Sequence, residues 1–434
     1  MNLCVVGAGY VGLVSGACFA EFGNAVVVVD KDETKIAALR SGRIPIYEPG
    51  LEDLVDRNVK AGRLRFAHDV AEAVRESLVV FIAVGTPQAE DGRADLTYVR
   101  DVARTIARNL TGYKVIVTKS TVPAGTGREI RTIVERERDS AHPFSVASNP
   151  EFLREGSAIE DFLRPNRVVF GTEDEMAAAI LSDLYRPLYL IETPIIRTDV
   201  VTAELIKYAS NAFLATKISF INEIADLCEA LGADVHGVAR GMGLDRRIGG
   251  KFLHPGPGYG GSCFPKDTRA AVEIAREAGL DLRIVRAVIE VNESRVPRML
   301  AKLRAAVGGE LAGRTIGQLG LTFKPNTDDL RESPAMAVLA GILAAGARAR
   351  VYDPVANAIL VATPREGVTY CADEYDAATG ADALVVATEW NQFRGLDLDR
   401  LKSCLVRPTI VDLRNVYEPH VVRSKGFHYT GVGR

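Results

Sequence analysis

One cysteine stands in a setting that can prepare a nucleophile. Cys263 lies in the run Gly260-Gly261-Ser262-Cys263-Phe264-Pro265-Lys266-Asp267. Pro265 can open a helix, which would place the thiol beside the positive end of a helix dipole and near Lys266. Both influences favour the thiolate, the form that attacks carbon, and the two glycines are expected to leave room for a substrate. The alternative is an inert cysteine in the core, as we expect of the other five.

A second chemical signature lies at the amino terminus. The run Gly7-Ala8-Gly9-Tyr10-Val11-Gly12 fits GxGxxG directly after a β-branched run. Gly7 permits a tight turn, Gly9 lets the backbone approach a pyrophosphate, and Gly12 lets the following helix pack closely. The next β-run ends at Asp30, whose carboxylate can accept hydrogen bonds from a ribose diol and would repel a 2′-phosphate. The pattern therefore predicts NAD rather than NADP, whereas the glycines alone would fit an ordinary turn.

Two pairs of polar residues spaced four apart could contribute to a site, although each also has a structural explanation. Asn149-Pro150 is typical of a helix start, which would put Glu151 and Glu155 on one face of the first turn. Carboxylates there also simply complement the helix dipole. Lys207 and Asn211 have the same spacing on a predicted long helix, where a solvated polar stripe is the default explanation.

An NAD site combined with a reactive thiol narrows the chemistry. Alcohol oxidation requires hydride transfer and proton removal but no covalent bond, whereas a thiolate is useful at the aldehyde level. Its addition gives a thiohemiacetal, which can lose a second hydride to leave a thioester that water hydrolyses. The predicted reaction converts a primary alcohol to a carboxylate with two NAD. The alternatives are a one-step hydroxyacid dehydrogenase with a structural Cys263 and a catalytically silent nucleotide-sugar-binding protein.

The elements that must position these residues are predicted by hydrophobic periodicity. The first two hundred residues alternate β-branched runs with helical patterns, which predicts a parallel sheet with crossover helices. A long helix over 198–231 follows, and a further helical segment extends to about Val307. From Arg314 the alternation resumes, and Asp353 ends a strand there as Asp30 does in the first half.

We therefore predict an α/β protein with two Rossmann-like doubly wound parallel-sheet domains, joined by a long central helix and a helical middle domain. The predicted NAD-binding domain covers 1–197. A central dimerisation domain that carries Cys263 covers 198–307, and the second Rossmann-like domain covers 308–434. A chain of 434 residues has room for about three domains.

Composition excludes several classes of partner. Hydrophobic residues make up 47% and charged residues 25%, as in a packed globular protein. With 53 Lys+Arg against 56 Asp+Glu, the chain has no positive field to attract nucleic acid or an anionic membrane surface. The six cysteines lack metal-binding spacing, so no metal is expected and reduced thiols fit a cytoplasmic location. The apolar opening from Leu3 to Ala20 is broken by four glycines, and no other run approaches the roughly 18 uninterrupted apolar residues of a membrane span.

Taken together, the motifs resemble those of the UDP-glucose/GDP-mannose dehydrogenase family. GxGYVG, VGTP, KSTVPAGT, NPEFLREG, GGSCFPKD and FKPNTDDLRESP follow the family's order over almost the whole chain. The resemblance implies that the first domain binds NAD, the last binds the UDP portion of a sugar nucleotide, and the long helix forms a homodimer core. It implies that Cys263 is the nucleophile in oxidation of UDP-glucose at C6 to UDP-glucuronate. The segment 245–259 is similar to the UDP-glucose branch, with UDP-N-acetylhexosamines and GDP-mannose as competing substrates.

Chemistry and resemblance together give three sets of candidate residues. The catalytic set comprises Cys263, Lys207, Asp267, Asn211, Thr121 and Glu151. The NAD-contacting set comprises Gly7, Gly9, Val11, Gly12, Asp30, Lys35, Thr86, Thr121, Glu155, Lys266 and Arg331. The sugar-nucleotide set comprises Glu151, Phe152, Leu153, Arg154, Glu155, Lys207, Asn211, Arg247, Phe252, Leu253, His254, Pro255, Gly256, Gly260 and Lys324.

Each catalytic candidate other than Cys263 has a chemical role. A desolvated Lys207 can stabilise alkoxide and tetrahedral oxyanions, with Asn211 helping to position them. Asp267 can accept a proton or orient water during thioester hydrolysis, with Thr121 bonded to the same water. Glu151 is a competing general base or acid for that step, and the sequence does not rank the two carboxylates.

Three cations among these candidates, two of them in the sugar-nucleotide set and Arg331 in the NAD-contacting set, have roles of their own. Lys324 and Arg331 supply the positive charge that a pyrophosphate requires. Arg247 is similar to an arginine that reaches the sugar held by a neighbouring subunit.

Overall fold

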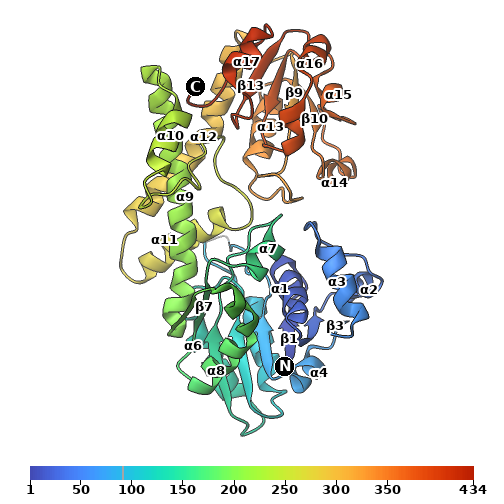
Figure 1. Cartoon of the computed structure of the whole chain (residues 1–434), viewed down its shortest axis with the longest axis vertical. Coiled ribbons are helices and arrows are strands. Elements are labelled where there is room, and N and C mark those ends of the chain that lie inside the picture. The colour runs from blue at the N-terminus through green and yellow to red at the C-terminus, as the bar shows by residue number, and fades with distance from the viewer. Residues whose placement is uncertain (90–91) are drawn as a thin grey trace. The chain divides into compact units, whose positions relative to one another are not determined.

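The computed structural model of the chain describes residues 1–89 and 92–434 and divides into two compact units (Figure 1). Unit 1 comprises residues 1–210 and 273–279, and unit 2 comprises residues 211–272 and 280–434. Two of the three boundaries fall inside helices, namely α9 (Val200–Leu231) and α11 (Phe264–Glu277), and the third follows Gly279, after α11 ends.

Unit 1 contains an eight-stranded sheet in the order β3-β2-β1-β4-β5-β6-β7-β8. Its strands are β1 (Asn2–Val6), β2 (Ala25–Val29), β3 (Leu64–Ala67), β4 (Val79–Ile82), β5 (Lys114–Thr118), β6 (Phe144–Ser148), β7 (Val168–Gly171) and β8 (Ile195–Thr198). The first six strands pair in parallel, in the order typical of a dinucleotide-binding sheet. The strand order reverses between β1 and β4, and such folds bind ligands at the carboxyl ends of the strands at this point.

The last two strands depart from the parallel arrangement expected for this region. β7 pairs with β6 in antiparallel orientation, through Ser148 and Gly171, and β8 is parallel to β7. An antiparallel neighbour begins at the edge of the sheet where the preceding strand ends. The connection from β6 to β7 therefore remains at the edge where the predicted ligand-binding turns lie.

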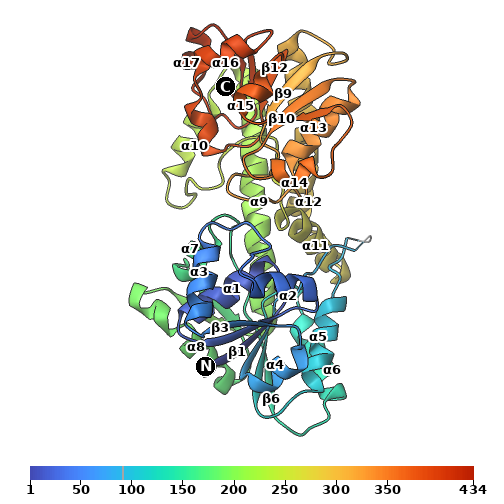
Figure 2. The same cartoon turned by 90° about the vertical axis from the view of Figure 1, so that its right-hand side faces the viewer.

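Helices cover both faces of the unit 1 sheet (Figure 2). One face packs against α1 (Tyr10–Glu21), α2 (Glu33–Arg40), α3 (Leu51–Lys60), α7 (Ala158–Leu163), α8 (Glu175–Leu184) and the 3₁₀ helix η1 (Arg186–Ile191). The other face packs against α4 (Val70–Glu76), α5 (Thr97–Ala107) and α6 (Thr126–Glu137). β1 shows the alternation that produces two cores, since Leu3 and Val5 face the first set of helices while Cys4 and Val6 face the second.

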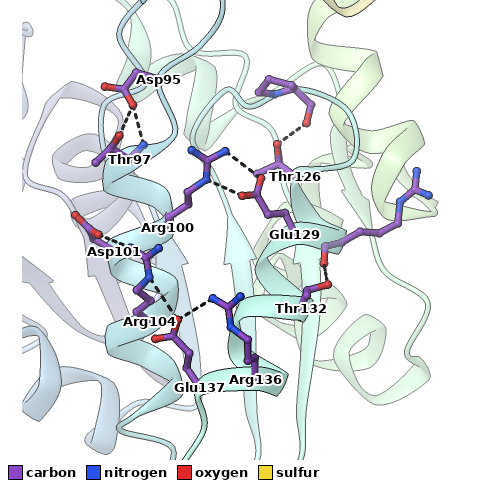
Figure 3. A network of polar contacts seen from close by, with 12 residues as sticks. Asp95, Thr97, Arg100, Asp101, Arg104, Thr126, Glu129, Thr132, Arg136 and Glu137 are labelled. Carbon is purple, nitrogen blue, oxygen red and sulfur yellow. Dashed lines mark hydrogen bonds and ion pairs between the residues drawn. The ribbon is translucent and has the colours of Figure 1, made fainter. Parts of the chain in front are cut away.

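Ion pairs join α5 to α6 on their outer surface (Figure 3). Arg100 Nε lies 2.6 Å from Glu129 Oε1, and Glu137 receives three arginines, Arg104, Arg108 and Arg136. Exposed pairs of this kind contribute about 0.2–1 kcal/mol each, so the buried apolar seam between the helices sets their packing. At its start α6 is tied to the preceding loop, because Thr126 Oγ1 donates to the Pro123 carbonyl at 2.6 Å.

Unit 2 contains a six-stranded, fully parallel sheet in the order β11-β10-β9-β12-β13-β14. Its strands are β9 (Thr315–Leu319), β10 (Arg348–Tyr352), β11 (Val368–Tyr370), β12 (Ala383–Val386), β13 (Thr409–Asp412) and β14 (His428–Thr430). One core joins the sheet to the unit 2 part of α9 and to α10 (Val235–Gly243), α12 (Arg283–Val307), α13 (Pro334–Ala344) and the short α14 (Asn357–Val361). The other joins it to α15 (Glu374–Ala378), the 3₁₀ helix η2 (Asn391–Gly395), α16 (Leu398–Cys404) and α17 (Pro419–Ser424).

The two sheets and the long helices confirm the predicted fold class. α9 ends at Leu231, directly before Gly232, which has a left-handed φ of 70°. α12 ends at Val307, and Gly308 follows with φ 78°. Within the described residues, no helix is long and apolar enough to cross a membrane.

The acid that ends β10 is occupied by its own fold. Asp353 is fully buried, and its Oδ2 accepts the N–H groups of Leu321 and Thr322 and the indole N–H of Trp390. Its Oδ1 accepts two backbone N–H groups of the following turn. Asp353 occupies a strand end in the second sheet as Asp30 does in the first, but its role there is to hold the fold.

Candidate active site

The glycine turn after β1 has the geometry that a dinucleotide requires. Gly7 has φ 111°, and a Cβ on Gly12 would lie 1.8 Å from the Gly7 carbonyl oxygen, so α1 packs too closely for a side chain. A Cβ on Gly9 would meet no heavy atom within 4 Å. The missing side chain at Gly9 thus leaves open space beside the N-terminus of α1, whose first N–H groups attract an anion.

Asp30 follows β2 and lies against this turn. Its Oδ2 accepts the Ala8 N–H at 2.8 Å and the Lys35 ammonium at 3.2 Å, and its Oδ1 accepts the Asp32 N–H at 3.0 Å. A carboxylate has about four lone-pair sites, so this one can still accept a ribose hydroxyl at Oδ1. The space at Gly9, the α1 N-terminus and Asp30 together fit NAD.

The loops after β4 and β5 are hydrogen-bonded to each other. Thr86 Oγ1 donates to the Thr121 carbonyl at 2.8 Å, and Ser120 Oγ donates to the Val84 carbonyl at 2.6 Å. Two threonines predicted to contact NAD therefore lie together at the carboxyl ends of adjacent strands.

Glu204 on α9 fixes the far end of the second of these loops. It is 2% exposed, and its two carboxylate oxygens accept the N–H groups of Gly125 and Gly127 at 2.6 and 2.8 Å. Burial raises the pKa of Glu204 to about 7, although the two backbone N–H groups oppose the shift. The loop that carries Thr121 is thus anchored at its end, before α6, by a carboxylate that titrates near neutral pH.

The segment Asn149–Glu155 is an irregular loop, and the expected helix start at Asn149-Pro150 is wrong. The next helix, α7, begins at Ala158. Glu151 and Glu155 therefore do not share a helix face, and a helix dipole does not account for them either.

Buried hydrogen bonds to Asn149 explain this departure. Asn149 is 1% exposed, its Oδ1 accepts the Lys119 ammonium at 3.0 Å and the Tyr185 hydroxyl, and its Nδ2 donates to the Val169 carbonyl at 2.7 Å. The side chain is therefore unable to cap a helix, which is what its type and the following Pro150 had suggested.

Glu151 and Lys207 form a buried ion pair inside unit 1. Lys207 Nζ lies 2.8 Å from Glu151 Oε1, and the two residues are 3% and 6% exposed. Burial alone would raise the pKa of Glu151, but the Lys207 ammonium and the Leu153 N–H outweigh it and lower the pKa. Lys207 also lies 5.7 Å from the centroid of the Phe152 ring. Four predicted substrate residues thus meet in one cluster.

The rest of this loop is fixed by neighbouring charges. Arg154 makes a bidentate pair with Asp161, at 2.9 and 2.6 Å. Glu155 is half-buried, and its charge contributes to the raised pKa of Tyr10, after burial and Glu48. Glu155, a predicted NAD contact, therefore lies near the first residue of α1.

In unit 2, Cys263 directly precedes α11, as the sequence predicted. Its carbonyl accepts the Asp267 N–H at 2.8 Å, which makes Cys263 the N-cap residue, and the half-buried thiol lies 3.5 Å from Ser262 Oγ. Burial raises the pKa of Cys4 to about 12 and that of Cys371 to about 11. These two thiols are inert, whereas Cys263 is partly exposed at the positive end of a helix dipole.

Asp267 links the start of α11 to α9. It is 1% exposed, and its two oxygens accept Asn211 Nδ2 at 2.6 Å and Lys266 Nζ at 2.7 Å. Asn211 is itself 6% exposed. The expectation of a solvated polar stripe for Lys207 and Asn211 is therefore wrong, because both are buried and each is bonded to a carboxylate.

The two glycines before Ser262 accommodate the chain itself. A Cβ on Gly260 would lie 2.2 Å from the Glu332 carbonyl oxygen, and one on Gly261 would lie 2.7 Å from the Phe323 ring. The idea that they clear space for a substrate is therefore wrong, since backbone and an aromatic ring of the segment 323–332 fill that space.

This packing places the segment that carries Lys324 and Arg331, the cations expected to bind a pyrophosphate, beside the loop 260–263. The Gly261 N–H donates to the Arg331 carbonyl at 3.0 Å, and Lys324 lies next to Phe323, with its ammonium 5.4 Å from the ring centroid. The Arg331 side chain is held by both oxygens of Asp329, at 2.7 and 2.8 Å. Lys324 and Arg331 thus lie on one segment packed against Gly260 and Gly261.

The predicted substrate segment 252–256 runs close to the same loop. Phe252 has a left-handed φ of 66°, and its ring centroid lies 6.1 Å from that of Phe264. Leu253, Pro255 and Gly256 are buried, whereas His254 is exposed. Arg247 lies apart on the surface, where Asp245 binds its guanidinium in bidentate fashion at 2.6 and 3.0 Å.

Sequence reasoning missed the side chains that hold this segment and the Glu151 loop. Asn222 Oδ1 accepts the Gly256 N–H at 2.8 Å, and the fully buried Arg295 donates to the Gly256 carbonyl at 3.3 Å. Arg414 lies so close that a Cβ on Gly256 would be 3.2 Å from its Nη1. Arg414 and Lys119 each follow a strand at its carboxyl end, and that position was the available signal.

Comparison with known proteins settles the family. Three domain models of the UDP-glucose/GDP-mannose dehydrogenase family match the chain, namely its NAD binding domain at residues 1–189, its central domain at 201–294 and its UDP binding domain at 317–419. The chain belongs to the UDP-glucose/GDP-mannose dehydrogenase family. This dehydrogenase uses NAD, which confirms the prediction from the glycine turn and Asp30.

Individual relatives of this dehydrogenase cover the whole chain. It is 57% identical to the UDP-glucose 6-dehydrogenase of Rhizobium meliloti (strain 1021) over the full length of both chains. Among solved structures, a UDP-glucose dehydrogenase from the archaeon Pyrobaculum islandicum is 43% identical, with a TM-score of 0.92 over 99% of this chain and 97% of that one. A UDP-D-ManNAc dehydrogenase from Pyrococcus horikoshii is 28% identical, with a TM-score of 0.88 over 100% and 99%.

Proposed function

We propose that this dehydrogenase oxidises UDP-glucose at C6 to UDP-glucuronate, using two NAD and covalent intermediates on Cys263. The observation that carries the proposal is the partly exposed Cys263 thiol at the N-terminus of α11, with Asp267 buried four residues along. A one-step alcohol dehydrogenase has no use for a thiol placed in this way. The 57% identical relative is named a UDP-glucose 6-dehydrogenase, which supports the substrate.

The proposed division of labour follows the three predicted domains, with NAD held by 1–197, the cysteine by 198–307 and the UDP portion by 308–434. When bound, NAD accepts one hydride in each of two oxidation steps. From unit 1 we assign to it the turn Gly7–Gly12, Asp30, Lys35, Thr86, Thr121 and Glu155, and from unit 2 Lys266 and Arg331. Phe252–Gly256, Gly260, Lys324 and Arg247 are assigned to the sugar nucleotide.

The reaction proceeds through bonds to sulfur. The C6 hydroxyl loses a proton and C6 loses a hydride, which leaves an aldehyde. The Cys263 thiolate adds to the aldehyde carbon, and the alkoxide takes up a proton to give a thiohemiacetal. Loss of a second hydride and a proton gives a thioester. Water then cleaves the carbon–sulfur bond, which releases the carboxylate and regenerates the thiolate.

Buried polar groups supply the charges that these steps need. The Lys207 ammonium stabilises the oxyanions that form at C6, and Asn211 positions them. Asp267, held between Asn211 and Lys266, orients the hydrolytic water with Thr121. Glu151, whose pKa is lowered mainly by Lys207 against the effect of burial, is ionised at neutral pH and is the competing base for the same step.

The alternative substrates are a UDP-N-acetylhexosamine and GDP-mannose. The relative named a UDP-D-ManNAc dehydrogenase is only 28% identical, against 57% for the relative named for UDP-glucose. These values favour UDP-glucose. The six free cysteines and the nucleotide substrates fit a cytoplasmic location.

We further propose a homodimer through α9. Five large apolar side chains of this helix are exposed, at 44–73% of their surface: Leu205, Phe213, Phe220, Leu227 and Leu231. Phe213, Phe220 and Leu227 recur every seven residues and so share a face. Light scattering of the double variant Phe213→Glu/Leu227→Glu should report a monomer. Leu244→Glu, at an exposed leucine outside α9, is the matched control and should leave a dimer.

The function is tested by counting NADH per sugar consumed, with limiting UDP-glucose, GDP-mannose or UDP-N-acetylglucosamine. UDP-glucose should give two NADH and the other sugars much slower reaction. Cys263→Ser should lower complete turnover by about 1,000-fold or more, because the thiohemiacetal no longer forms. Cys404→Ser, at the other partly exposed cysteine, should turn over normally. One NADH per UDP-glucose, or normal acid formation by Cys263→Ser, would refute the covalent mechanism.

A further inference from the structure

Lys119 is a buried charge to which neither the motifs nor the proposed chemistry gives a role. It follows β5 directly and is 3% exposed. Its ammonium donates to Asn149 Oδ1 at 3.0 Å, to the Asn149 carbonyl at 3.4 Å and to the Tyr185 hydroxyl at 3.5 Å. These bonds tie Lys119 to the first residue of the loop that carries Glu151.

Lys119 also completes an unbalanced buried cluster. With Lys207 and Glu151 it makes two ammonium groups and one carboxylate, all at most 6% exposed. One cation would neutralise Glu151, and an uncompensated buried charge is costly. Burial lowers the pKa of Lys119 to about 8, Glu151 opposes the shift and Lys207 adds to it, so Lys119 is mostly charged at pH 7. The fold therefore maintains a second cation that stability does not require.

Two other charged groups, Asp161 and Arg167, line the same cavity as Lys119, and the Asp161 carboxylate is already paired with Arg154 at 2.6 Å. The Cys18 thiol on α1 and the Tyr185 hydroxyl are both buried, with pKa values raised by desolvation, so both are neutral. The Phe162 ring on α7 lies 5.8 Å from the ammonium. Glu151 is the carboxylate that acts on Lys119, and Lys207 is the cation.

We propose that Lys119 is a positioning residue that holds Glu151 for the oxidation. This proposal rests on the proposed function. It fixes the start of the Glu151 loop through Asn149, and its charge keeps Glu151 ionised beside Lys207. The pair then enters both oxidation steps in the same protonation state.

A small cavity makes the proposal testable by substitution. It has a volume of about 40 Å³, and its walls include Lys119, Asn149, Glu151, Arg167 and Tyr185. Roughly two or three water molecules fit in such a volume between polar groups. Water can therefore replace part of the lysine side chain without overpacking.

The experiment compares Lys119→Gln and Lys119→Met with Lys114→Met. Glutamine keeps a donor for Asn149 but removes the charge, and methionine removes both. Lys114 is also 3% exposed but begins β5, where it donates to the Ser77 and Arg75 carbonyls at the opposite end of the strand. It is therefore a matched buried lysine remote from Glu151.

Two readouts separate positioning from mere structure. Infrared difference spectra, assigned with Glu151→Gln, should show Glu151 protonating at higher pH in both Lys119 variants, because a cation that lowers its pKa is gone. With saturating UDP-glucose and NAD, kcat should fall between about tenfold and about 100-fold with little change in KM, and its acidic limb should move to higher pH. Lys114→Met should lower the melting temperature but keep the wild-type kcat and pH profile.

The outcomes distinguish this proposal from the function on which it rests. An unchanged Glu151 titration in Lys119→Gln overturns the role of Lys119, whatever the substrate proves to be. A wild-type kcat and pH profile in Lys119→Gln, or an equal loss in Lys114→Met, also overturns it. Absence of NADH from wild-type protein and UDP-glucose overturns the proposed function instead, while the infrared titration still decides the role of Lys119.

Discussion

Replacing Glu204 with glutamine should change how the stability of unit 1 depends on pH. Burial raises the pKa of this carboxyl from an ordinary 4.5 to about 7, and the charges of Arg128 and Glu173 act on it in opposite directions. A displacement of this size corresponds to roughly 3 kcal/mol. Because the folded state holds the proton more tightly than the unfolded chain, this stabilisation is complete below about pH 4.5 and is lost as pH rises through about 7.

The unfolding free energy of wild type minus that of Glu204→Gln should therefore fall by about 2–3 kcal/mol between pH 5 and pH 8, because only the wild type has a carboxyl that must ionise. Urea unfolding followed by far-ultraviolet circular dichroism measures it, while fluorescence of Trp390, the single tryptophan, marks the transition of unit 2. Asp199→Asn is the control, since hydrogen bonds from Thr202 lower the pKa of Asp199 and its contribution is constant in this range. A value of wild type minus variant that stays flat or rises with pH would refute the reasoning.

Four further substitutions test the geometry of the site. Gly9→Ala should leave the unfolding free energy within about 0.5 kcal/mol, because φ is an ordinary −79° and the space is empty, yet weaken NAD binding in calorimetric titration. Gly12→Ala should instead lower the melting temperature, and equal effects of the two would contradict this account. Gly261→Ala should lower the free energy of unfolding measured by calorimetry by about 1–3 kcal/mol, because φ is +81° and an aromatic ring fills the site. Asn211→Ala should lower the free energy of unfolding by about 1–3 kcal/mol and slow NADH formation, because Asp267 loses a hydrogen-bond donor. A wild-type rate of NADH formation would exclude a role of Asn211 in the reaction.

The scaffold could be predicted because its signals are local. The glycine turn at Gly7–Gly12 and the acid at Asp30 are defined by residues close in sequence, and Gly232 and Gly308 stop helices by their own conformation. Alternating β-branched runs identified the central strands of both sheets. The edge strands β3, β8, β11 and β14 lack such a pattern, because polar residues interrupt their apolar runs, as Arg65 does in β3 and Arg197 in β8.

The environment of the site residues could not be predicted, because distant partners determine it. Asn149 looked like a helix cap, but Lys119 and Tyr185, 30 and 36 positions away, bury its amide. Lys207 and Asn211 looked solvated, but each is bonded to a carboxylate 56 positions away. The tight packing at Gly260 and Gly261 likewise depends on a segment more than sixty residues downstream.

The occupied carboxylate of Asp353 has a kinetic consequence. Since its oxygens already accept donors from its own fold, the acid that ends β10 is not available to the ribose of a second dinucleotide. On the proposed mechanism, both hydride equivalents then pass to NAD bound at the turn Gly7–Gly12, one after the other. Reduced cofactor has to depart and fresh cofactor has to arrive while the half-oxidised sugar stays in place. Its residence time on the protein must therefore exceed the time for cofactor exchange, and escape of free aldehyde measures how well this condition is met.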